Sequence, residues 1–128
     1  MIYIVQNLIP ILLATAAGLI MGYGYRALTI RPVGAPRARH LVTAALAEAW
    51  LCAILAGALI LAPVRAGVWT VAIGTAIIIW IGFVVPATIV TLTTRGVRLS
   101  GAVVDCGYWL VVMLTQAVVL RGVGLVHP

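Results

Sequence analysis

Residues 81–120 decide the fold, and they read IGFVVPATIVTLTTRGVRLSGAVVDCGYWLVVMLTQAVVL. This stretch holds the end of one apolar run, a short basic turn and a second apolar run. The second run contains Asp105, one of only 2 acidic residues in the chain. Placing a carboxylate within an apolar membrane helix costs about 2.5–3.5 kcal/mol on insertion scales. We therefore expect another part of the chain to provide a partner for Asp105.

The composition indicates a membrane protein. Of the 128 residues, 65% are apolar and 8% are charged, whereas roughly a quarter are charged in soluble domains. A bilayer is therefore the expected solvent. The net charge of +6 comes from arginines that stand between the apolar runs, where membrane topology places them. No basic helix face or aromatic platform accompanies them, so we expect no nucleic-acid partner.

Four apolar runs predict an all-α, integral membrane four-helix bundle that forms a single domain over residues 1–128. Each run is long enough to cross a hydrocarbon core of about 30 Å at about 1.5 Å per residue. The first and third connections hold most of the arginines. The positive-inside rule then predicts a multi-pass protein of the cell inner membrane with both termini outside, in the periplasm. The expected spans are residues 2–25, 41–62, 68–92 and 99–120.

Small residues and a proline mark special positions in two of these helices. Ala14, Gly18 and Gly22 form a ridge on the first helix that allows another helix to approach closely, within the chain or in an oligomer. Pro86 is expected to kink the third helix and to free a carbonyl near Gly82. Because four helices bury few of their faces, we expect a homo-oligomer, most simply a dimer.

The first connection, residues 26–40, is the most basic segment and reads RALTIRPVGAPRARH. Its arginines are expected to fix the orientation of the chain and to contact anionic lipid headgroups, at about 1 kcal/mol per charge. The four arginines concerned are Arg26, Arg31, Arg37 and Arg39.

The predicted topology gathers polar side chains in the cytoplasmic half of the bundle. Glu48 follows the start of the second helix by about 12 Å, and Asp105 follows the start of the fourth by about 7.5 Å. On the fourth helix Gln116 lies within about 20° of Asp105, which gives a polar stripe. The candidate intramembrane polar site comprises Asp105, Glu48, Tyr108, Tyr23, Tyr25, Arg26, Gln116 and Asn7.

Three classes of function remain open on these residues. A structural or assembly bundle would use Asp105 as an anchor that pairs with an Arg or Tyr of another helix, and we take this class first. A small transporter or channel would use a polar path at Glu48 and Asp105. A small membrane enzyme would bind a thiol through Arg26 and the neighbouring tyrosines.

Each class predicts a different interior. A dry interior with paired acids would favour the structural class, and a cavity ending at Asp105 would favour transport. A cleft that holds Arg26 and opens sideways to lipid would favour an enzyme. We assign no catalytic residue, metal ligand or cofactor, because no Ser-His-Asp order, phosphate loop or metal-ligand spacing is present. Cys52 and Cys106 are interpreted as small apolar packing residues.

Three segments resemble the bacterial membrane family catalogued as domain of unknown function 1761. They are residues 79–86 (IWIGFVVP), 96–99 (GVRL) and 104–110 (VDCGYWL). Asn7, Gly22 and Tyr23 resemble the N-terminal helix of that family. The first connection departs from the family, which often carries a Phe-Gly-Lys-x-x-Trp-like segment there. The resemblance implies a four-helix integral membrane protein and no particular activity.

Overall fold

The structure, a computed structural model, describes residues 2–29, 38–63 and 65–127. These residues are helical apart from short turns and a C-terminal tail, and they contain no strand. In chain order the elements are α1 (Ile2–Gln6), α2 (Leu8–Thr29), α3 (Ala38–Leu61), α4 (Val68–Ile79), the π-helical turn η1 (Trp80–Val84), α5 (Val85–Thr94) and α6 (Leu99–Val123).

Four helical rods are long and apolar enough to cross a membrane, which confirms the all-α four-helix bundle. They are Leu8–Thr29, Ala38–Leu61, Val68–Thr94 and Leu99–Val123. The second, third and fourth rods lie within a few residues of the expected 41–62, 68–92 and 99–120. The first rod begins and ends later than the expected 2–25.

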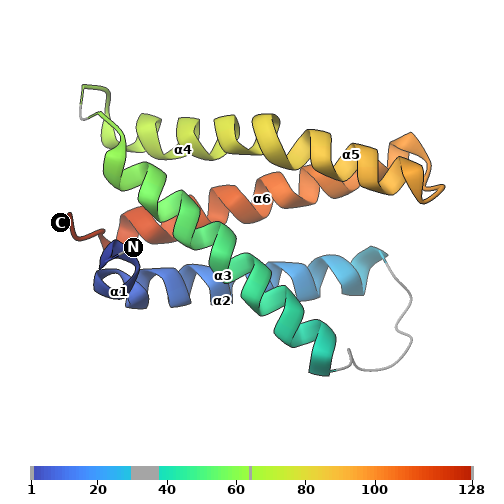
Figure 1. The fold of residues 1–128 in the computed structure, drawn as a ribbon, viewed down its shortest axis with the longest axis horizontal. Helices are drawn as coiled ribbons and strands as arrows, with labels where there is room; N and C mark the ends of the chain where they lie inside the picture. The colour runs from blue at the N-terminus through green and yellow to red at the C-terminus, as the bar shows by residue number, and fades with distance from the viewer. Residues whose placement is uncertain (1, 30–37, 64, 128) are drawn as a thin grey trace.

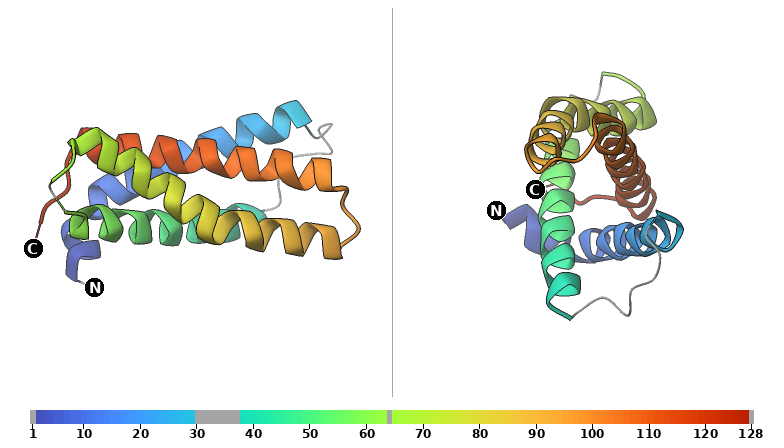
Figure 2. Two further views of the ribbon diagram at one scale, coloured as in Figure 1. Left: turned by 90° about the horizontal axis from the view of Figure 1, so that it is seen from above. Right: turned by 90° about the vertical axis from the view of Figure 1, so that its right-hand side faces the viewer.

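The rods run side by side, and both termini lie at one end of the bundle (Figures 1 and 2). We call this the terminal end. The loop end is the opposite one, where α2 ends, α3 begins and α5 turns into α6. α6 packs against α2, α3, α4 and α5, so it is the central element. α3 crosses α2 obliquely (Figure 1) and packs against α4; within the described part of the chain it does not touch α5.

The first apolar run is divided at Asn7, so the expectation of one continuous first helix is wrong. Pro10 has no backbone N–H to donate to the carbonyl of Gln6, which weakens the helix at this point. The side-chain amide of Asn7 donates to the carbonyl of Tyr3 at 3.0 Å. The same carbonyl accepts from the backbone N–H of Asn7 at 3.0 Å, so the side chain adds a second hydrogen bond at the break.

A π-helical turn, Trp80–Val84, interrupts the third rod. The backbone N–H of Val85 donates to the carbonyl of Trp80, five residues earlier, which is the π-helical pattern. The indole N–H of Trp80 donates to the backbone carbonyl of Cys106 at 2.8 Å, which ties the turn to α6. Such turns are rare and occur often at functional sites. The kink expected at Pro86, just after this turn, stays a prediction.

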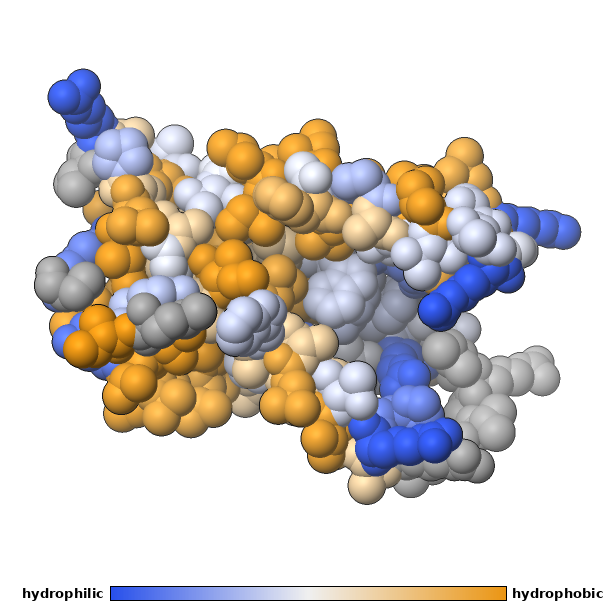
Figure 3. Space-filling model, in the orientation of Figure 1, coloured by the Kyte–Doolittle hydropathy of each residue, from blue (hydrophilic) through white to orange (hydrophobic). Residues whose placement is uncertain are grey.

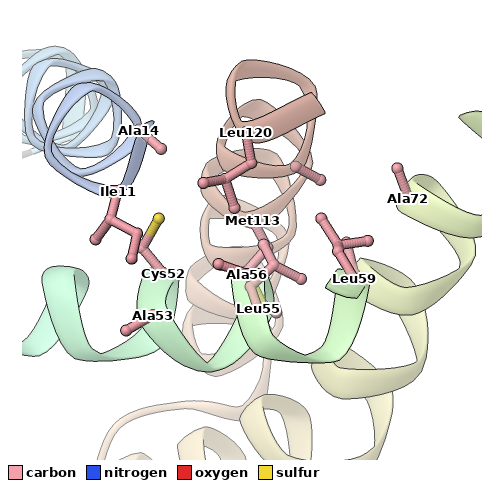
Figure 4. Close-up of a cluster of buried hydrophobic side chains, with 12 residues drawn as sticks. Ile11, Ala14, Cys52, Ala53, Leu55, Ala56, Leu59, Ala72, Met113 and Leu120 are labelled. Carbon is pink, nitrogen blue, oxygen red and sulfur yellow. The ribbon is translucent and has the colours of Figure 1, made fainter. Parts of the chain in front are cut away.

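The apolar core occupies the terminal half of the bundle and is built largely from small residues (Figure 4). Small side chains let helices approach closely in a membrane protein. Cys52 is buried among them and Cys106 is buried nearby, both as free thiols, which agrees with the packing role expected for them. Many large apolar side chains are exposed instead and cover the visible surface (Figure 3), as a lipid-facing surface requires. The core residues are Ile11, Ala14, Cys52, Ala53, Leu55, Ala56, Leu59, Ala72, Ala76, Met113, Ala117 and Leu120.

Candidate functional site

A cavity of about 680 Å³ lies in the loop half of the bundle, between α2, α3, α5 and α6. Figure 3 shows the molecule hollowed between α5 and the first turns of α3. The cavity exists because α3 diverges from α5 and because small residues face it, among them Gly22, Ala44, Ala47 and Ala87. The interior is therefore not fully packed at this end.

Six of the eight predicted site residues line this one cavity. Both acidic residues of the chain are among them, one from α3 and one from α6. Tyr23 is 70% exposed. Gln116 and Asn7 do not line the cavity. The six lining residues are Asp105, Glu48, Tyr108, Tyr23, Tyr25 and Arg26.

Asp105 has a tyrosine partner, one of the two residue types, Arg or Tyr, that the sequence predicted. The hydroxyl of Tyr25, on α2, donates to Asp105 Oδ1 at 2.6 Å. The ring of Tyr25 stacks on that of Tyr108, with centroids 4.4 Å apart and planes 15° from parallel. No described arginine forms an ion pair with Asp105 within the 4.0 Å limit. A tyrosine on α2, together with a ring stack, thus anchors Asp105 to the bundle.

Glu48 differs from Asp105 because it is buried without a partner. It is 3% exposed, and among the described residues no donor reaches its Oε2. Its other oxygen, Oε1, lies 3.8 Å from the position that a Cβ of Gly22 would take, and the hydroxyl of Tyr108 lies 2.6 Å from the same position. Oε2 lies against Gly18 and Gln116, which do not line the cavity, so Glu48 borders the inner part of the cavity through Oε1, beside Gly22.

Gln116 lies behind Glu48, on the side away from the loop end. It is 0% exposed, and neither Nε2 nor Oε1 has a partner in the described part of the chain. A Cβ on Gly18 would come within 2.9 Å of Gln116 Nε2 and would overlap the Glu48 carboxylate. The ridge of small residues on α2 thus makes room for polar side chains of α3 and α6.

Asn7 belongs to a different part of the molecule, at the terminal end. Its Nδ2 donates to the carbonyl of Val126 at 3.0 Å, and its Oδ1 accepts from the N–H of Val126 at 2.7 Å. It is fully buried. Asn7 therefore fastens the C-terminal tail to the junction of α1 and α2, and the structure does not bring it to the cavity.

Two polar or aromatic residues that line the cavity, His40 and Trp109, were not among the predicted site residues. His40 lies in the first turn of α3, where it is exposed and lines the cavity. Trp109 lines it as well, next to Tyr108, with ring centroids 5.5 Å apart. The position of His40 two turns before Glu48 on one helix is the signal that could have found it.

The four arginines expected to contact lipid headgroups are not equivalent. Arg26 lines the cavity, and Arg39 is exposed in the first turn of α3. Arg31 and Arg37 lie outside the described residues.

Comparison of the chain with protein-family models, with curated proteins and with solved structures gave no match.

Proposed function

We propose that this protein is a small membrane carrier that binds an organic cation in the cavity of the loop half. The observation that carries the proposal is that Glu48, buried and without a partner, faces a cavity that also contains Asp105, the only other acid of the chain. The proposal thus favours the transport class over the structural class that came first from the sequence.

The charge distribution supports a cationic ligand. The chain as a whole has a net charge of +6, yet among the described arginines only Arg26 lines the cavity, against two carboxylates. A carboxylate held in an apolar helix region is costly, at about 2.5–3.5 kcal/mol on insertion scales. A bound cation offsets this cost, because charges attract more strongly where water is excluded.

The cavity walls support a partly apolar cation. The aromatic faces of Tyr108 and Trp109 line the cavity together with apolar side chains such as Leu19 and Leu92. An aromatic face attracts a nearby cation by about 0.5–2 kcal/mol, depending on how far the site is desolvated. An organic amine with an alkyl or aryl part matches both features.

The cavity is one-sided, which favours a carrier over a channel. It occupies the loop half, whereas the terminal half is filled by the small-residue core and closed by the contact of Asn7 with Val126. A carrier would open the terminal end in a second state. The π-helical turn before α5 is the irregular element at which α5, one wall of the cavity, would move.

An enzyme is a weaker reading of the same cleft. The cavity does contain Arg26 and lies between α3 and α5, as an enzyme would require. Covalent catalysis by an activated side chain typically also uses a base in contact with a nucleophile. The side-chain pair found within the described part of the cavity is Tyr25 with Asp105, and this pair joins two helices.

The structural class remains the second candidate, because Asp105 is already satisfied by Tyr25. In that reading the carboxylate serves only to hold α2 against α6. The two candidates make opposite statements about Glu48: a structural protein has no use for an unpartnered acid that faces a cavity.

The cellular setting of the proposal follows from the sequence. The loop end, which carries most of the arginines, would face the cytoplasm of the inner membrane, and both termini would lie outside. The chain would associate as a homodimer and contact anionic lipid headgroups through its exposed arginines. Membership of the family catalogued as domain of unknown function 1761 is part of this proposal and adds no activity to it.

The test is binding followed by transport. Purified protein in an uncharged maltoside detergent is titrated with hexylammonium, and tryptophan fluorescence is recorded. We expect saturable binding that Glu48→Gln weakens at least tenfold, while Arg98→Gln, a change outside the cavity, leaves it unaltered. Uptake of labelled hexylammonium into proteoliposomes should likewise depend on Glu48. Binding that is equal in the wild type and in Glu48→Gln would remove the proposal.

A further inference from the structure

The cavity holds charges of both signs that do not pair with each other. Glu48 faces it without a partner, and Arg26 lines it without an ion pair to either acid in the described chain. We propose that the ligand is a zwitterion, with an ammonium group held by Glu48 and an anionic group held by Arg26. This inference rests on the proposed function and narrows the class of ligand.

The ammonium end of the site is formed around Gly22. The hydroxyl of Tyr108 and Glu48 Oε1 lie 2.6 Å and 3.8 Å from the position of a Cβ on that glycine, so both oxygens border the same small space. All three residues line the cavity. An ammonium group has three N–H donors and no acceptor, which suits a carboxylate beside a phenolic oxygen.

The anionic end lies nearer the mouth of the cavity. Arg26 follows Gly22 by four residues on α2, so the two lie on the same side of the helix, about 6 Å apart along its axis. Asp105, the other acid in the cavity, is engaged by Tyr25. The guanidinium of Arg26 therefore keeps its donors for an anion, and such a group binds carboxylate or phosphate through two parallel hydrogen bonds.

The two ends of the site lie close together along α2. Gly22 and Arg26 are one helical turn apart and both line the cavity, so an ammonium and an anion joined by a short linker would reach both ends. A phosphoethanolamine group and a short ω-amino acid both have this form. The hollow between α3 and α5 would admit the headgroup of an aminophospholipid as well as a free zwitterion.

The experiment compares matched ligands on the full chain in maltoside micelles. Hexylammonium, 6-aminohexanoate and O-phosphoethanolamine are titrated, and tryptophan fluorescence reports binding. We expect the better of the two zwitterions to bind at least tenfold more tightly than hexylammonium. Arg26→Gln should bring the zwitterion to the affinity of the amine and leave the amine unaffected. Arg98→Gln, at the same end of the bundle but outside the cavity, is the control and should change neither.

The outcomes separate this inference from the proposed function. If hexylammonium binds through Glu48 as tightly as both zwitterions, the inference of a zwitterionic ligand is wrong, whereas the proposed function as a carrier of an organic cation is retained. If no probe shows binding that depends on Glu48, both fail. Since Arg26 is exposed, its substitution leaves the fold intact, and the thermal stability of each variant checks this.

A last arm identifies the source of the zwitterion. The bound probe is challenged with dilauroylphosphatidylethanolamine and, as a control, with dilauroylphosphatidylcholine, whose ammonium has no N–H donor. Displacement by the first lipid alone supports the headgroup as the ligand. If neither lipid displaces the bound probe, the result supports a free zwitterion as the ligand. Equal displacement by both lipids would overturn the role of Glu48 and Tyr108 as acceptors for an ammonium.

Discussion

Gly18 is the position at which the arrangement of polar side chains around α2 can be tested most directly. A Cβ there would lie 2.9 Å from Gln116 Nε2 and 3.3 Å from Glu48 Cδ, and it would overlap Glu48 Oε2. Adding a methyl group to such a packed site costs about 1–3 kcal/mol. Against this, alanine in place of glycine in a helix interior gains about 1 kcal/mol from propensity.

Gly24 provides a matched control on the same helix. A Cβ at Gly24 would meet nothing within 4 Å, so Gly24→Ala has the gain in propensity without the crowding. The propensity terms of the two variants cancel in their difference. The free energy of unfolding of Gly18→Ala should therefore be lower than that of Gly24→Ala by about 1–3 kcal/mol.

The assay is unfolding of purified protein in maltoside micelles with increasing sodium dodecyl sulfate, followed by tryptophan fluorescence. In order of decreasing stability, we expect Gly24→Ala, then the wild type, then Gly18→Ala. Removing the neighbour in the double variant Gly18→Ala/Gln116→Ala should cost less than the two single changes together, because the groups touch. Equal stability of Gly18→Ala and Gly24→Ala would refute the placement of Glu48 and Gln116 against this helix.

Four further predictions concern two polar contacts, the topology and the number of chains. Asp105→Asn should be more stable in a thermal melt than Asp105→Leu, because Leu leaves the Tyr25 hydroxyl without its acceptor at a cost of about 1–3 kcal/mol; the reverse order would show that this pair anchors nothing. Asn7→Ala, which loses its contacts with Val126, should lower stability by a similar amount, about 1–3 kcal/mol, and Gln6→Ala, at an exposed neighbour, should have little effect. A reporter fused to the C-terminus should be active only outside the cytoplasm, and the mass of the detergent complex should correspond to two chains; cytoplasmic activity would reverse the topology, and one chain would exclude the dimer.

The architecture could be predicted because hydrophobicity and helix length determine it almost alone. Each apolar run must satisfy its backbone within one helix in lipid, so the number of runs gives the number of rods. The break at Asn7 was not foreseen. It depends on Pro10 together with the contact of Asn7 with Val126, more than a hundred residues away, and a local pattern contains no such information.

The partner of Asp105 was foreseen as an Arg or Tyr of another helix, and a tyrosine, Tyr25, has the role. Arg95 and Arg98 directly precede the helix that carries Asp105, but neither forms an ion pair with it. Tyr25 lies near the end of α2, which runs antiparallel to α6. Its hydroxyl therefore reaches Asp105 across the contact of α2 with α6. Which of several side chains at one depth makes the bond depends on helix rotation, which the sequence leaves open.

The two acids of the chain have separate tasks, and their surroundings explain the division. Asp105 is half-buried, accepts a hydrogen bond from Tyr25 and lies beside stacked rings, so it has a partner within the chain. Glu48 is buried more deeply and lacks such a partner, which is costly unless something else supplies one. Stability alone would favour an apolar residue at that position. The proposed function explains such an acid beside a cavity through a ligand, which is why its tests centre on Glu48.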